Sequence, residues 1–421
     1  MRTSVFPKAL NWFKLVSLTG STQLVVQAIG FICGILVVRL LPSSEYAYYT
    51  LANTMLGTMT LLADGGIANG VMAQGGKVWK DKMRLGTVLS TGIVLRKKFA
   101  VFSLLVATPV LLWLLRTNDA SWLMSVMITL SVIPAFISAL TGKIIRIGPK
   151  LNQDILPLQK ITVLQNSGRL FLTAIFVFAF PFAGIAILAT GISEVYANYR
   201  LRRISHKYAD FSQKEDPEVR SKILNTVKRI MPGAVYYSIS SQITIWVISI
   251  FGSTQALAEV GALTRLGMVL TVFSITFSTL ITPRFARFPF APKILIRYFL
   301  GIQLALILLA YAIVTTVWLF PAQVLWILGE GYAGLTSEVV LMSAGYAFGL
   351  VGGCMSQLCS SRGYLFKGYI MVGFGVLQNA MILLVDYASL EGILLYSLLV
   401  SLTSIVYTNA QFLFKLKDNG S

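Results

Sequence analysis

About twelve apolar stretches recur along this chain of 421 residues, most of them long enough to cross a lipid bilayer. The stretches at 99–115 and 182–199 are short, so eleven or thirteen crossings are the alternatives. A helix needs about 20 mainly apolar residues to span the hydrocarbon core, since it rises about 1.5 Å per residue. Charged residues make up only 12% of the sequence, against about 25% in a typical soluble domain. We therefore predict an all-α polytopic membrane protein with spans at residues 15–38, 46–73, 99–115, 120–140, 161–180, 182–199, 230–252, 259–283, 298–320, 335–358, 368–386 and 390–414.

The Lys and Arg residues divide unevenly between the two sides of these spans. With the N-terminus in the cytoplasm, all but four of the 35 fall on the cytoplasmic side, the exceptions being Arg39, Arg116, Arg169 and Arg265. Such a bias sets orientation in the membrane, so we expect an inner (plasma) membrane protein with both termini cytoplasmic. Topology and attraction to anionic headgroups then account for the net charge of +19, and no nucleic-acid partner is expected.

The longest hydrophilic stretch, residues 200–229, predicts a cytoplasmic linker between an N-terminal six-helix lobe (1–199) and a C-terminal six-helix lobe (230–421). Glu45 and Glu259 each open the second helix of their half, and the same offset carries Tyr199 onto Leu413, near the end of the last span. This agreement indicates an internal duplication. Halves with an even number of spans face the same way, with substrate expected between them.

Several segments resemble a known family. The segment Val38–Tyr49 resembles the first outer loop of Wzx-type oligosaccharide flippases, which belong to the superfamily of multidrug (MATE), oligosaccharidyl-lipid and polysaccharide exporters, although Ala47 stands where that family usually has Gly. The run Val324–Tyr332 is similar to the family's outer loop after the ninth span, and Glu259–Gly261 and Thr282–Arg284 fit its eighth span.

The resemblance implies a MATE-like fold of two pseudo-symmetric six-helix lobes. It also implies translocation of polyprenyl-diphosphate-linked oligosaccharide from the cytoplasmic to the outer leaflet by alternating access, for O-antigen (lipopolysaccharide), capsule or exopolysaccharide. The implied partners are undecaprenyl-diphosphate-linked oligosaccharide, membrane lipids and other polysaccharide assembly proteins. No cofactor is implied.

Charged residues inside a membrane are rare and usually functional. Arg169 lies about 13 Å and Glu194 about 9 Å from the cytoplasmic ends of adjacent spans, by the helical rise. We predict that the two side chains lie within salt-bridge distance. They could form a structural ion pair, contact a diphosphate, or couple release of Arg169 to protonation of Glu194.

Two further arginines lie near the outer side. Arg265, about 9 Å below that surface, resembles a cavity arginine of related lipid flippases, and its guanidinium suits bidentate phosphate binding. Snorkelling of the side chain to the interface is the alternative reading. Arg39 ends the first span and is better explained as an interface anchor, although the repeat places it near the boundary between the lobes.

Other polar groups have weaker interpretations. Asp64, beside Gly65 and Gly66, predicts a bend and a helix-end or gating contact with the basic segment after Gln74, rather than ion coupling. Gly345, Gly349 and Gly353 predict tight helix packing. In the seventh span, the polar side chains either line a glycan cavity or join helices by hydrogen bonds: Tyr236, Tyr237, Ser238, Ser240, Ser241 and Gln242.

The sequence offers no enzymatic constellation. It contains no GxxxxGK phosphate-binding loop, no cluster of metal ligands, and a single histidine, His206, in the linker. A glycan polymerase or ligase would need a sizeable outer loop, and every predicted outer connection is short. A MATE-type drug or cation antiporter would share the fold but should carry cavity carboxylates, whereas the deep candidates here are arginines.

The orientation is directly testable. A reporter fused after Lys417 should be active only on the cytoplasmic side, because the positive charges hold both termini there. The measurement compares a phosphatase reporter, active outside, with a fluorescent protein that matures inside. Phosphatase activity alone would contradict the topology.

Overall fold

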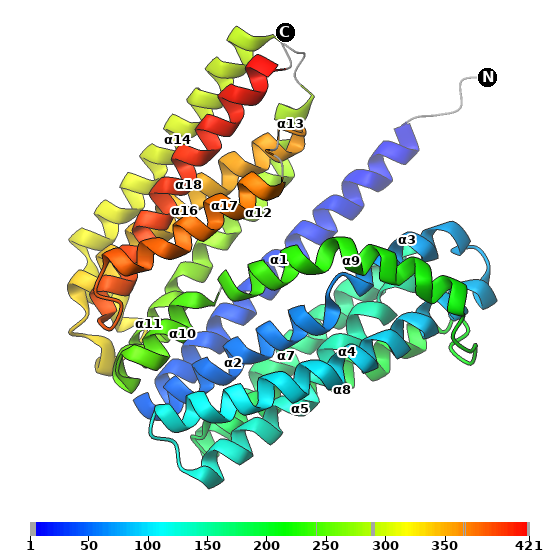
Figure 1. Cartoon of the computed structure of the whole chain (residues 1–421), viewed down its shortest axis with the longest axis horizontal. Helices are drawn as coiled ribbons and strands as arrows, with labels where there is room; N and C mark the ends of the chain where they lie inside the picture. The colour runs from blue at the N-terminus through cyan, green and yellow to red at the C-terminus, as the bar shows by residue number, and fades with distance from the viewer. Residues whose placement is uncertain (1–5, 241, 288–290, 365, 367, 419–421) are drawn as a thin grey trace. The chain divides into compact units, whose positions relative to one another are not determined.

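The computed structural model describes the backbone of residues 6–240, 242–287, 291–364, 366 and 368–418. Within these ranges the chain forms helices and turns and no strand. Eight of the described helices are long and apolar enough to cross a membrane, and the expected all-α polytopic fold is confirmed. The chain packs as two compact units, unit 1 (Met1–Gln242) and unit 2 (Ile243–Ser421) (Figure 1).

The other four predicted spans fall on helices that are broken or more polar. Residues 182–199 lie on α8 (Ala183–Ser205). The remaining three are each split, over α2 (Ser43–Asp64) and α3 (Ile67–Val78), over α9 (Pro217–Ser240) and α10 (Ile243–Phe251), and over α17 (Gly368–Ala380) and a 3-10 turn at Met381–Leu384.

Unit 1 is a bundle in which α5 (Trp122–Ile145) packs along α8, and α8 along α7 (Ile155–Ala179) (Figure 1). Helix α1 (Phe6–Leu40) lies against α7, and α4 (Lys82–Thr117) packs on both α2 and α5. The short helix α6 (Ile147–Leu151) joins α5 to α7 in sequence. Helix α4 exceeds the predicted span 99–115 by about five turns at its N-terminal end, so its basic residues lie on a continuous helix.

The bend predicted beside Asp64 is present. Gly65 and Gly66 both have left-handed backbone conformations, with φ of 45° and 93°, which glycine adopts without a steric penalty. A Cβ atom on Gly66 would lie 2.9 Å from Cβ of Ile230 on α9. The glycine pair therefore separates α2 from α3 and allows α9 to approach closely.

The packing boundary differs from the predicted lobe boundary. Helix α8 continues to Ser205, and α9 begins at Pro217, inside the expected linker. Helix α9 packs on α3, α2 and α4, so residues 230–240 pack with unit 1. The assignment of functional lobes at 1–199 and 230–421 remains a prediction.

Only residues 206–216 connect α8 to α9, and they are tied to α4. The Asp210 amide donates to the Lys82 carbonyl at 3.0 Å, and a Cβ atom on Gly86 would lie 2.0 Å from the Asp210 carbonyl oxygen. The Asp216 amide donates to Thr91 Oγ1 at 3.0 Å. Hydrogen bonds from Gln213 and Ser212 lower the pKa of Asp210 to about 2, so this carboxylate is ionised throughout the physiological range.

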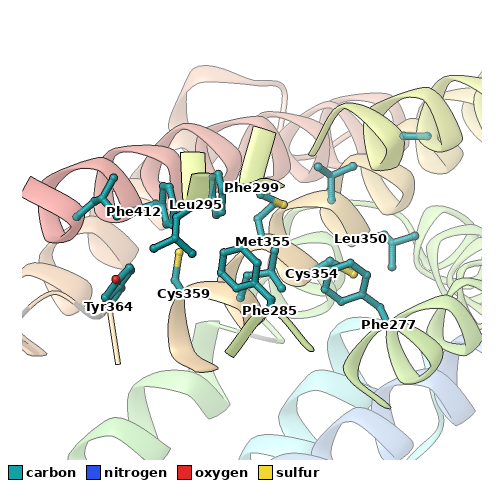
Figure 2. Close-up of a cluster of buried hydrophobic side chains, with 14 of the residues drawn as sticks. Phe277, Phe285, Leu295, Phe299, Leu350, Cys354, Met355, Cys359, Tyr364 and Phe412 are labelled. Carbon is teal, nitrogen blue, oxygen red and sulfur yellow. The ribbon is translucent and has the colours of Figure 1, made fainter. Parts of the chain in front are cut away.

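Unit 2 is built around α16 (Thr336–Ser361), which packs on α18 (Leu390–Asp418) and α14 (Pro292–Leu319). Its other helices include α11 (Thr254–Gly267), α12 (Thr271–Leu280), α13 (Thr282–Ala286) and α15 (Pro321–Trp326). Figure 2 shows the buried core, where the rings of Phe299 and Phe412 stack with centroids 3.7 Å apart. Met355, Cys354 and Cys359 fill the space between these helices.

The glycine stripe on α16 is shifted from the prediction. Cβ atoms on Gly345, Gly349 and Gly352 would lie 3.3, 3.2 and 3.2 Å from the hydroxyl oxygens of Ser397, Ser401 and Ser404 on α18. Gly353 has no heavy atom within 4 Å of its Cβ position. The contact with α18 is made by Gly352 instead, because the contacting glycines are spaced four residues apart and then three. Small residues let the two helices approach, as in other membrane bundles.

Adjacent glycines give a matched test of this contact. Gly352→Leu should lower the free energy of unfolding by about 1–3 kcal/mol through overpacking against α18, while Gly353→Leu should leave it nearly unchanged. The measurement is the unfolding midpoint of each purified variant in one detergent. Equal loss in both would refute the assigned face.

Candidate functional site: charged groups inside unit 1

An ion pair holds three helices of unit 1 together. Arg96 on α4 is only 2% exposed, and its guanidinium pairs with the carboxylate of Asp64 at the end of α2. The same guanidinium donates to the Leu140 carbonyl on α5. Asp64 also accepts a hydrogen bond from the Ala68 amide, 3.2 Å away across the glycine bend. Asp64 therefore contacts the basic segment after Gln74 as expected, through Arg96, but the contact is a buried ion pair on helix α4. A gating role for it remains a prediction.

Sequence reasoning missed Arg96 because it grouped this residue with Lys97 and Lys98 in a cytoplasmic segment. On the continuous helix α4, Lys97 and Lys98 are exposed, whereas Arg96 lies on the buried face with Ala100 and Ser103. Ala100 and Ser103 follow Arg96 by four and seven residues, and residues with this spacing share a helix face. This spacing to small residues was the sequence signal that could have predicted a buried Arg96.

A second set of polar contacts joins α7 to its neighbours. Arg146, just after α5, donates to Thr162 Oγ1 at 2.8 Å and to Gln165 Oε1 at 3.0 Å, both on α7. Arg169, further along α7, donates to the phenolic oxygen of Tyr49 on α2 at 3.2 Å. Arg146 was also counted as cytoplasmic, and its inward hydrogen bonds were not predicted.

Glu194 on α8 faces this set of cations. Arg169, Arg146 and Lys143 all act electrostatically on its carboxylate. One of its carboxylate oxygens is buried without a hydrogen-bond partner. Glu194 and Arg169 do not form an ion pair within 4.0 Å among the described residues. The prediction of a direct salt bridge between them is therefore wrong, and the Arg169 guanidinium donates to Tyr49.

The outer-loop motif has a structural role. Glu45 Oε2 accepts a hydrogen bond of 2.8 Å from the backbone amide of Ala183, the first residue of α8. A carboxylate at this place satisfies an otherwise unpaired amide and interacts favourably with the positive end of the helix dipole. This contact fixes the start of α8, the helix that carries Glu194.

The remaining predicted site residues lie on separate elements of the chain. Arg265 on α11 is half-buried and acts electrostatically on the ring hydroxyl of Tyr346 on α16. Arg39 is exposed at the end of α1. Gln242 is half-buried in a turn, while Ser241 and the side chain of Tyr237 lie outside the described residues. None of these placements tests the predicted substrate contacts.

Arg96, Arg146, Arg169, Asp64 and Glu194 thus form the candidate site, three guanidinium groups against two carboxylates. Guanidinium groups bind phosphate and carboxylate by parallel hydrogen bonds. Among the described residues, no group of three or more His, Cys, Asp or Glu is placed to hold a metal ion.

No family model and no curated protein sequence matches this chain. Solved structures do match its fold. A multidrug-resistance MATE-family transporter of the MOP superfamily, in an inward-facing conformation, has a TM-score of 0.75 and 16% identity over 94% of this chain and 96% of its own. A multidrug-resistance MATE-family transporter in an outward-facing conformation has a TM-score of 0.57 and 15% identity over 96% of both chains.

A MOP-superfamily transporter from Pyrococcus furiosus, described as having a binding pocket of reverse polarity that suggests a different function, has a TM-score of 0.54. It shares 16% identity with this chain, over 96% of both chains. These likenesses show that the chain has the fold of MATE transporters.

The ion pair yields a stability test. Asp64→Asn should lower the free energy of unfolding by about 3–5 kcal/mol, because it leaves the Arg96 guanidinium buried without a counter-charge. Glu218→Gln, which breaks the exposed pair with Lys222, should cost about 0–1 kcal/mol. Denaturant unfolding of both variants in detergent compares them, and equal losses would mean that Arg96 is solvated.

Proposed function

We propose that this chain is a flippase that moves polyprenyl-diphosphate-linked oligosaccharides to the outer leaflet of the inner membrane. The observation that carries the proposal is the excess of guanidinium groups inside unit 1. Asp64 pairs with Arg96, while Arg146 donates to the neutral side chains of Thr162 and Gln165, so three guanidinium groups are set against two carboxylates. A net positive interior attracts an anionic substrate and disfavours a cationic one.

The chemistry of the substrate explains why arginine is suitable. A diphosphate that crosses a low-dielectric bilayer needs a cation on its path. The planar guanidinium binds phosphate oxygens bidentately and remains charged at every physiological pH. In this proposal Arg169, Arg265 and Arg39 are the candidate diphosphate contacts, and Tyr237, Ser241 and Gln242 are the candidate sugar contacts.

The fold supports the mechanism of alternating access. MATE-family transporters of this fold have been solved in an inward-facing and in an outward-facing conformation. Pocket polarity also varies among proteins of this fold, since that of the Pyrococcus furiosus transporter is described as reversed. We accordingly infer the substrate from the charges of this chain. Cytoplasmic termini and surface-polysaccharide partners belong to the same proposal.

A drug or cation antiporter of the MATE type is the second candidate. Two acidic residues inside unit 1, Asp64 and Glu194, favour it, because an antiporter can exchange a cation or proton at a carboxylate. Asp64, however, is paired with Arg96, and three cations act on Glu194. Both carboxylates are thus electrostatically compensated, which leaves little attraction for a cationic drug. A glycan polymerase or ligase has no observation in its favour.

Transport by arginine variants tests the proposal. In a strain that lacks its own oligosaccharide flippase, the wild-type chain should restore surface glycan, Arg265→Lys should restore part of it, and Arg265→Ala and Arg169→Ala should restore little. The measurement is surface glycan at matched membrane levels of each variant.

Arg116 provides the matched control. It is exposed at the end of α4, where it donates to the Ala120 carbonyl and lies over the Trp122 ring, so Arg116→Ala should transport normally. Failure of the wild type to restore glycan, together with export of cationic dyes, would favour the antiporter. Full transport by Arg265→Ala would assign that side chain to snorkelling.

A further inference from the structure

A groove between α4, α5 and α8 combines an apolar slot with exposed cations. The slot lies between α4 and α5, has a volume of about 320 Å³ and is lined mainly by Ala100, Val101, Leu104, Ile137, Leu140 and Ile144. A second hollow of about 390 Å³ adjoins it and is lined by Lys97, Arg202, Asn198 and Tyr199, among others. The two share Ile93, Lys97 and Thr141, so they form one continuous groove.

The two exposed cations of this groove form no ion pair among the described residues. Lys97 and Arg202 are both exposed, and neither takes part in an ion pair within 4.0 Å among the residues that the structure describes. Asn198 donates to the Ser138 carbonyl at 2.6 Å and holds α8 against α5 beneath them. The groove thus presents two positive charges, Lys97 from α4 and Arg202 from α8, that are not engaged in close ion pairs.

By the apolar length of α4, the groove extends across the boundary between the lipid headgroups and the hydrocarbon core. The apolar part of α4, from Phe99 to Leu115, spans about 26 Å by the helical rise, close to the thickness of the hydrocarbon core. Lys97 stands at the end of this part, and Arg202 follows the apolar part of α8. The slot therefore lies at acyl-chain depth, and the two cations lie at headgroup depth. An anionic amphiphile has this same order of charge and apolar chain.

We propose that this groove binds one anionic phospholipid of the surrounding bilayer, with its phosphate between Lys97 and Arg202 and one acyl chain in the slot. Exposed residues of the slot, Val101 and Ile137, are 58% and 52% accessible, so a bilayer lipid can enter from the side. The proposal does not rest on the proposed function, although Arg96 of the candidate site also lines the slot. Each cation near an anionic headgroup strengthens binding, and the apolar slot adds burial of the chain.

The test uses the full chain in neutral detergent, titrated with phosphatidylglycerol or phosphatidylcholine and observed by native mass spectrometry. Phosphatidylglycerol should bind with one tight site and phosphatidylcholine should not. Lys97→Gln with Arg202→Gln should weaken that site about thirtyfold, from the loss of two headgroup contacts. Ala100→Phe, which fills the slot without changing charge, should also weaken it.

Lys98→Gln is the matched control, because Lys98 is exposed next to Lys97 and lines neither part of the groove. Its affinity for phosphatidylglycerol should equal that of the wild type. Equal weakening by Lys98→Gln, or unchanged binding by the double variant, would overturn the site. Displacement by glycerol phosphate alone would show a headgroup-only site and would also contradict the proposal, as would tighter binding of polyprenyl phosphate there.

Discussion

A charged side chain among apolar helices must find a counter-charge or a set of hydrogen bonds, and this constraint determines how unit 1 is built. Arg96 satisfies it with Asp64 and the Leu140 carbonyl, so α4, α2 and α5 meet at one point. Asp64 stands immediately before the Gly65–Gly66 bend, and α3 beyond that bend provides the surface on which α9 packs. The ion pair therefore fixes the end of α2 and, through it, the start of the α3–α9 layer.

The inward-facing arginines of unit 1 satisfy this constraint in two different ways. Arg96 is compensated by a carboxylate, whereas Arg146 bonds to Thr162 and Gln165, which are neutral. Glu194 faces three cations at once and has a buried oxygen without a hydrogen bond. In the proposed flippase, the diphosphate would accept hydrogen bonds from these guanidinium groups, and Glu194 would compete with it for the same cations. Competition of this kind gives a carrier a means of releasing an anion, because neither partner needs to hold the guanidinium groups permanently.

Apolar length was sufficient to predict an all-α polytopic fold, since unpaired backbone groups are costly in lipid. The orientation that the charge bias predicts stays a prediction. The bend at Gly65 and Gly66 was also predictable from residue type. The inward orientation of Arg96 and Arg146 was not, because a basic residue beside exposed lysines reads as a loop until the extent of α4 is known. The partner of Arg169 depends on which face of α7 meets α2, and sequence spacing along α7 contains no information about that rotation. Likewise, only the register of α16 against α18 distinguishes Gly352 from Gly353.

Reconstitution is the most direct measurement of the central claim, that the chain carries an anionic lipid-linked saccharide. Purified protein would be placed in liposomes with a short-chain, fluorescent polyprenyl-diphosphate disaccharide, and outer-leaflet substrate would be followed by access to an added lectin or hydrolase. We expect the protein to accelerate equilibration between the leaflets, with a cationic dye neither transported nor competing. Transport of the dye without any acceleration of the diphosphate lipid would contradict the account.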